Sequence, residues 1–124
     1  MSKILIVDDE EDIRSLLKRF LTKKEYDVVT ASDGYQALIK VKDWEPDIVL
    51  LDILMPGISG MEVLPLIKET NEKIGIIMIT AVRDVETGRK ALSMGADDYI
   101  TKPFDLNYLE TSVMAKILMI ESGY

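Results

Sequence analysis

Short apolar runs alternate along this chain with longer stretches in which apolar residues recur every three or four positions. The run from Lys3 to Val7 is compact and rich in β-branched residues, as expected of a strand that is buried on both faces. Four similar runs follow, with VVTA, IVLL, IIMI and YIT in them. We therefore predict five strands, over residues 3–7, 27–31, 47–51, 75–80 and 98–101.

The intervening stretches predict five helices. In the first, apolar residues at positions 13, 16, 17, 20 and 21 form an amphipathic stripe, and Asp12 precedes it as the predicted N-cap. The fourth, over residues 84–94, contains Gly88 and has a thin apolar stripe, so we expect it to be mobile. Other sequence signals mark where helices begin or end. The second helix begins at Asp33-Gly34 and ends before Pro46, and the third begins at the capping-box sequence Ser59-Gly60-Met61-Glu62. Gly95 ends the fourth helix, and Asp105 precedes the fifth.

Five strand–helix units in succession predict an α/β fold with a parallel sheet. Crossover connections between parallel strands are right-handed, so helices must cover both faces of the sheet. In open sheets of this kind, ligands bind beyond the carboxyl ends of the strands. The residues that follow each strand are therefore the first place to look for a functional site.

Composition narrows the classes of function. The 124 residues suit one domain, which we place at 1–124, and 22 acidic against 15 basic side chains give a net charge of −7. The chain has no cysteine and no histidine, which excludes disulfides, thiol catalysis, zinc–thiolate sites and histidine chemistry of its own. The acidic balance disfavours direct contact with nucleic acid. The apolar runs are too short to span a membrane or to form a signal peptide, so we expect a cytoplasmic protein without membrane contact.

Polar residues stand at the predicted carboxyl ends of four strands. Asp8 and Asp9 follow the first strand, Asp52 the third, Thr80 the fourth and Lys102 the fifth. Carboxylates crowded at one edge repel one another unless a hard cation joins them, and Mg²⁺ prefers oxygen ligands. A carboxylate there can also act as a nucleophile toward phosphorus, with a hydroxyl and an ammonium to bind the phosphoryl oxygens.

Each of these residues also has a plain structural explanation. An acidic pair after a strand is most often a helix cap or a solvated loop. A single aspartate, threonine or lysine at such a position is most often a turn residue, a hydroxyl bonded to the backbone, or solvated surface. The functional interpretation depends on all of them occurring together at the matching edge of one sheet.

These residues carry a resemblance to a known family. Asp8-Asp9, Asp52 followed by Ile-Leu-Met-Pro-Gly, Thr80-Ala81 and Lys102-Pro103-Phe104 resemble the signature of bacterial, CheY-like response-regulator receiver domains. The resemblance extends from Lys3 to about Ile120. It implies a flavodoxin-like, doubly wound (βα)5 fold with strand order 2-1-3-4-5 and helices on both faces.

The resemblance also implies a role for each site residue. Asp52 would accept a phosphoryl group from a sensor histidine kinase or a phosphotransfer protein. Asp9, Asp52 and the backbone carbonyl of Leu54 would bind Mg²⁺, with Asp8 assisting through water. Thr80 and Lys102 would contact the phosphoryl oxygens.

Further positions concern the switch that phosphorylation would control. The resemblance implies a cis peptide bond between Lys102 and Pro103, and it makes Tyr99 the switch aromatic, although a half-exposed strand residue is the plain alternative. The partner surface would be formed by the fourth helix, fifth strand and fifth helix. It would bind a downstream protein or a fused output domain. A phosphorylation-dependent homodimer is left as an alternative. Apolar residues at Leu54 and Val82 predict slow self-dephosphorylation.

Two other classes of function remain as alternatives. A metal-dependent phosphatase would use Asp52 as its nucleophile, but such enzymes of the haloacid-dehalogenase type carry a second aspartate where this chain has Leu54. A phosphorylation-independent binding module would not need the complete acidic set. The sequence does not distinguish a stand-alone receiver from one cut out of a longer regulator.

Overall fold

The computed structural model describes residues 1–123 and contains one sheet of five parallel strands. The strand order is β2-β1-β3-β4-β5, as the resemblance implied. Four strands have the predicted bounds, whereas β3 begins one residue later, after Asp47, whose carboxylate accepts a hydrogen bond from the Lys3 N–H at 2.8 Å. The strands are β1 Lys3–Val7, β2 Asp27–Ala31, β3 Ile48–Leu51, β4 Gly75–Thr80 and β5 Asp98–Thr101.

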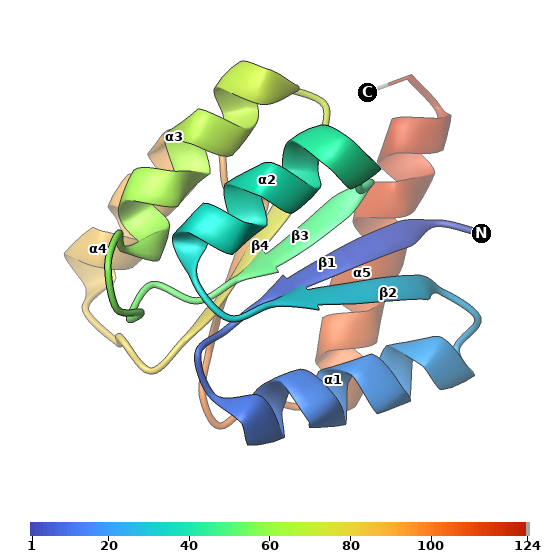
Figure 1. Cartoon of the computed structure of the whole chain (residues 1–124), viewed down its shortest axis with the longest axis horizontal. Coiled ribbons are helices and arrows are strands. Elements are labelled where there is room, and N and C mark those ends of the chain that lie inside the picture. Colours follow the sequence, from blue (N-terminus) through green and yellow to red (C-terminus); the bar gives the residue numbers. More distant parts are fainter. Residues whose placement is uncertain (124) are drawn as a thin grey trace.

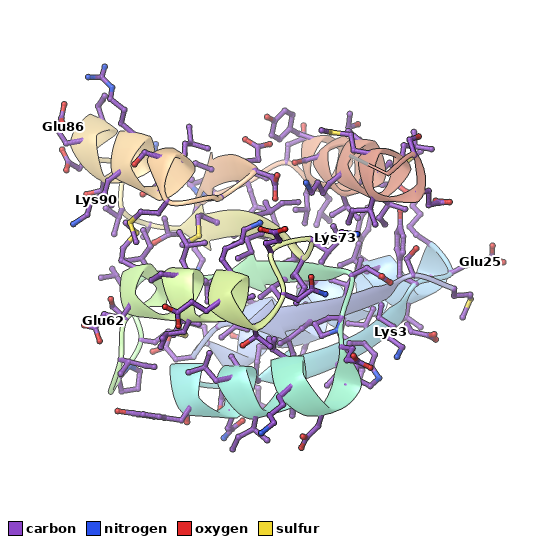
Figure 2. The ribbon with its side chains drawn as sticks, turned by 90° about the horizontal axis from the view of Figure 1, so that it is seen from above. Lys3, Glu25, Glu62, Lys73, Glu86 and Lys90 are labelled. Atoms are coloured by element: carbon purple, nitrogen blue, oxygen red, sulfur yellow. The ribbon has the colours of Figure 1, made fainter. Side chains whose placement is uncertain are left out.

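Helices cover both faces of this sheet (Figure 1). In Figure 2 the sheet lies between α2 on one side and α5 on the other, and Glu86 and Lys90 of α4 project outward. Figure 1 also shows that the strand arrows point away from the end of the molecule that carries both termini. The helices are α1 Glu11–Lys23, α2 Gly34–Trp44, α3 Gly60–Thr70, α4 Val85–Ser93 and α5 Leu106–Glu121.

The alternation of side chains along each strand divides the core into two layers. Leu5 and Val7 of β1 pack with α2, α3 and α4, whereas Ile4 and Ile6 pack with α1 and α5. The same alternation holds in β3 and β4, and all of these apolar strand residues are buried. A strand that is apolar at every position is therefore required here, because both of its faces meet helices.

Side-chain caps fix where four of the helices begin. Asp33, Ser59, Asp84 and Asp105 each accept a hydrogen bond from a backbone N–H of the first turn. The prediction for α1 is wrong: its N-cap is Glu10, and Asp12 lies within the first turn. Glu10 makes no side-chain cap bond to α1, because its carboxylate is turned toward Lys102, at 3.0 Å from the ammonium.

Helix α4 has few core contacts, as its sequence suggested. It buries Ala91, and the backbone of Gly88 packs against Tyr99, where an added Cβ would lie 3.6 Å from the ring. Gly95 has a positive φ of 113° and follows the C-cap, which confirms the predicted end of this helix. Within residues 1–123, no helix combines the length and the apolar character that crossing a membrane would require.

Candidate functional site

The carboxyl ends of four strands meet at one edge of the sheet. Backbone pairing continues one residue beyond the strands: the Asp52 N–H donates to the Val7 carbonyl at 3.0 Å, and the Lys102 N–H donates to the Thr80 carbonyl at 2.8 Å. These bonds hold the backbone of the predicted site residues in register. Residues that are far apart in the sequence are thereby fixed side by side.

Lys102 lies at the centre of the site. Its ammonium donates hydrogen bonds to Asp8 at 2.8 Å, to Glu10 at 3.0 Å and to Asp52 at 3.2 Å. The side chains of Asp8 and Asp52 are each only 4% exposed, whereas that of Glu10 is 60% exposed. An ammonium has three N–H donors, so these three carboxylates use all of them.

Four acidic side chains crowd together at this end of the sheet. Asp8, Asp9, Glu10 and Asp52 can each bring one carboxylate oxygen within 4.8 Å of the others. Four carboxylates beside one ammonium leave a local excess of negative charge. Because the donors are all hard oxygens, the arrangement suits a hard divalent cation such as Mg²⁺.

The ionisation of the buried pair reflects both burial and charge. Burial raises the pKa of Asp8 above its ordinary value, and the hydrogen bonds from Lys102 and from the Glu10 N–H offset only part of this effect. Burial acts to lower the pKa of Lys102, but its bonds to Asp8 and Glu10 and the charge of Asp52 prevail and raise that pKa. Lys102 therefore carries its positive charge throughout the physiological range.

Thr80 and Tyr99 are both hydrogen-bonded to Val82, which lies in the loop between β4 and α4. Thr80 is fully buried, and its hydroxyl accepts a hydrogen bond from the Val82 N–H at 3.3 Å. The Tyr99 hydroxyl donates to the carbonyl of the same Val82 at 2.7 Å, and its half-buried ring lies against Gly88. Burial, together with the charges of Asp84 and Asp52, raises the pKa of Tyr99, so the hydroxyl keeps its proton.

The remaining predicted residues line the rim of the site. The Leu54 N–H donates to the Asp52 carboxylate at 3.3 Å, while the Leu54 side chain is 58% exposed. The predicted cis peptide bond between Lys102 and Pro103 is confirmed.

Sequence reasoning missed several residues that shape the site. Glu10 was visible within the run of five acids at positions 8–12, but nothing local indicated that it would reach Lys102. Arg83 donates from its guanidinium to the Lys102 carbonyl at 2.5 Å and so joins two of the loops. Gly60 lies against the backbone after β3, where an added Cβ would be 2.1 Å from the Asp52 carbonyl oxygen. No sequence pattern predicts the last two contacts, because they depend on how the loops after β3, β4 and β5 fold.

Similarity to known proteins agrees with this geometry. The response regulator receiver domain family matches residues 4–114. The alkaline phosphatase synthesis transcriptional regulatory protein PhoP of Bacillus subtilis is 42% identical over 113 residues, which cover 91% of this chain and 47% of that protein. The chain spans about half the length of the curated relatives it matches.

Solved structures give the same result. A CheY-like receiver domain protein from Methanospirillum hungatei superimposes with a TM-score of 0.96 at 29% identity, covering 100% of this chain and 99% of the other. A chain in the CheX-CheY-BeF3-Mg²⁺ complex from Borrelia burgdorferi has a TM-score of 0.88 at 34% identity, over 92% of this chain and 87% of that one. The chain therefore belongs to the response regulator receiver domains, which are phosphoacceptor switches of two-component signalling rather than classical enzymes.

Proposed function

We propose that this chain receives a phosphoryl group on Asp52 from the phosphohistidine of a partner protein, and that Mg²⁺ assists. The observation that carries the proposal is the convergence of four carboxylates and one ammonium at the carboxyl ends of β1, β3 and β5. Response regulators work with histidine kinases or phosphotransfer proteins. Since these 124 residues contain no histidine, the donor phosphohistidine must lie outside them.

The residues present fit a magnesium ion. Asp9 and Asp52 offer carboxylate oxygens, and Asp8 an oxygen that would act through water. The resemblance to the family adds the backbone carbonyl of Leu54. When bound, Mg²⁺ would draw the phosphoryl oxygens toward the attacking carboxylate and neutralise part of their charge. The excess negative charge of the site favours cation binding before any phosphoryl group arrives.

The proposed transfer is an in-line displacement at phosphorus. An Asp52 carboxylate oxygen forms the new P–O bond while the P–N bond to the donor imidazole breaks. The electron pair of that bond returns to the imidazole, which takes up a proton from solvent and leaves as neutral histidine. Lys102 would stabilise the charge on the phosphoryl oxygens, because its ammonium already lies 3.2 Å from Asp52.

Phosphorylation would then act on a two-state equilibrium. The Thr80 hydroxyl accepts a bond from Val82 and keeps its own proton, which we expect it to donate to a phosphoryl oxygen. Because Tyr99 is bonded to the same Val82, movement of this loop would be passed to Tyr99 and to the neighbouring surface of α4, β5 and α5. That surface would bind the downstream protein or a fused output domain.

The donor protein would also contact the rim of the site. A hollow of about 480 Å³ opens there between α1 and the loop before α5, with Glu10 and Lys102 at its edge. Its other lining residues are apolar and include Leu16, which is 39% exposed, and Phe104. A donor whose phosphohistidine reaches Asp52 must cover this rim, so we expect it to place apolar side chains in the hollow.

Beryllofluoride with Mg²⁺ tests the proposal, since it mimics a phosphoryl group on an aspartate. We expect amide NMR shifts in the loops after β1, β3, β4 and β5 of the wild type, and none in Asp52→Asn. Asp43→Asn makes the same charge change at an exposed position on α2 and should respond like the wild type. Absence of any response in the wild type would favour a phosphorylation-independent binding module.

The phosphatase alternative predicts a different result. Sustained hydrolysis of a phosphomonoester by the wild type, lost in Asp52→Asn, would support it. We expect no such turnover, because Leu54 stands where the general acid would be required. We also expect the phosphoryl group on Asp52 to be lost slowly, since Leu54 and Val82 offer no polar side chain to an attacking water. A half-life as short as that of fast chemotaxis-type receivers would contradict this.

A further inference from the structure

Glu10 differs from the other acidic partners of Lys102. Asp8 and Asp52 are buried, and Asp8 is held further by a hydrogen bond from the Glu10 N–H at 2.9 Å. The Glu10 carboxylate, by contrast, reaches the ammonium from a side chain that is 60% exposed. It could leave that bond more readily than Asp8 or Asp52 leaves its own, because its carboxylate is already largely in contact with water.

The number of donors on Lys102 makes this difference matter. All three N–H groups of the ammonium are used by Asp8, Glu10 and Asp52. A phosphoryl oxygen can bond to Lys102 only if one carboxylate gives way. Asp8 is fixed by burial and by its backbone bond, and Asp52 carries the phosphoryl group itself. Glu10 is the most exposed of the three and therefore the easiest to exchange.

We propose that Glu10 is a positioning residue: it holds Lys102 in the unphosphorylated protein and is exchanged for a phosphoryl oxygen when Asp52 is phosphorylated. This inference rests on the proposed function of Asp52. Glu10 would keep the lysine aimed into the site while the phosphoryl group is absent. Its charge would also oppose the incoming phosphoryl group, so Glu10 would limit how tightly that group is held.

The test compares two neighbouring charge changes. Glu10→Gln removes the carboxylate at Lys102, and Glu11→Gln removes the same charge from the exposed first residue of α1, which is not among the partners of Lys102 within residues 1–123. Beryllofluoride is titrated into each variant at saturating Mg²⁺, so that weaker attraction of the cation does not enter. We expect about fivefold tighter binding by Glu10→Gln than by Glu11→Gln, from the repulsion of charges a few ångströms apart in water-like surroundings.

A second readout needs no phosphoryl mimic. The ¹⁵N signal of the Lys102 ammonium in the free protein should shift more in Glu10→Gln than in Glu11→Gln, because only the first variant changes one of its acceptors. Equal beryllofluoride affinities, or weaker binding by Glu10→Gln, would overturn the inference, as would an unchanged ammonium signal. Failure of the wild type to bind beryllofluoride through Asp52 would instead overturn the proposed function, and the exchange with it.

Discussion

The two edges of the sheet use acidic residues in different ways. At the amino edge, Asp47 accepts a hydrogen bond from the Lys3 N–H at 2.8 Å. Asp97 accepts from the Ile76 N–H at 2.9 Å and from the Lys116 ammonium at 3.0 Å. Each acid there has donors of its own. At the carboxyl edge, three carboxylates share the Lys102 ammonium, and the oxygens of Asp8, Asp9, Glu10 and Asp52 lie within 4.8 Å of one another.

The difference shows that acidic residues near strand ends do not by themselves indicate a site. Acids at the amino edge satisfy backbone donors and stabilise the fold. Those at the carboxyl edge exceed the positive charge available to them, so the fold tolerates repulsion that a cation would relieve. The excess of charge, and not the number of acids, separates the functional edge from the structural one.

The largest expected effect comes from the rigidity of the carboxyl edge. Gly60→Ala would place a Cβ 2.1 Å from the Asp52 carbonyl oxygen, and this backbone has little freedom to move. We expect the free energy of unfolding, measured in urea, to fall by about 3 kcal/mol. Gly88→Ala is the matched control, because its Cβ would meet the Tyr99 ring at an ordinary 3.6 Å. An equal loss of unfolding free energy in both variants would show that the close contact at the carboxyl edge is not the cause.

Magnesium should have the next largest effect. An ion that binds the folded state only, at about 100 times its Kd, adds about 2.7 kcal/mol to the free energy of unfolding. We expect thermal melting to shift upward with Mg²⁺ in the wild type and to respond weakly in Asp9→Asn. A melting temperature independent of Mg²⁺ would contradict the account of the carboxyl edge.

Breaking the amino edge should cost somewhat less. Asp97→Ala leaves the Ile76 N–H and the Lys116 ammonium without their acceptor, which we expect to lower the free energy of unfolding by about 2 kcal/mol. Asp97→Asn keeps an acceptor for the backbone N–H and should lose less. Beryllofluoride binding should be unchanged in both variants, since the edge is structural.

The smallest effect has the opposite sign. Asp9→Asn removes one of the four crowded charges, so without Mg²⁺ we expect the free energy of unfolding to rise by about 1 kcal/mol. Added salt should reduce this gain because it screens exposed charges. A loss of stability at low salt would mean that the Asp9 carboxylate makes favourable interactions, as the carboxylates of the amino edge do.

Local sequence patterns predicted the strands and helix starts that depend on residues close together in the chain. The apolar runs predicted the strands because each strand is covered on both faces. Ser59 and Asp105 are the N-caps of α3 and α5, as predicted. The first helix was predicted less well. Asp12 had the right chemistry for a cap, but Glu10 took the position because the bond to Lys102 orients its side chain away from the helix.

The sequence by itself determined five strand–helix units and an acidic, hydroxyl-bearing and cationic set at the ends of the strands. It did so because periodicity and turn chemistry act over a few residues. Only the tertiary structure decided which of those groups meet: Lys102 reaches Asp8 and Glu10 across more than ninety positions, and Arg83 reaches the Lys102 carbonyl from another loop. Such contacts depend on strand order and register, which arise from the packing of the whole sheet and leave no mark on any short stretch of the chain.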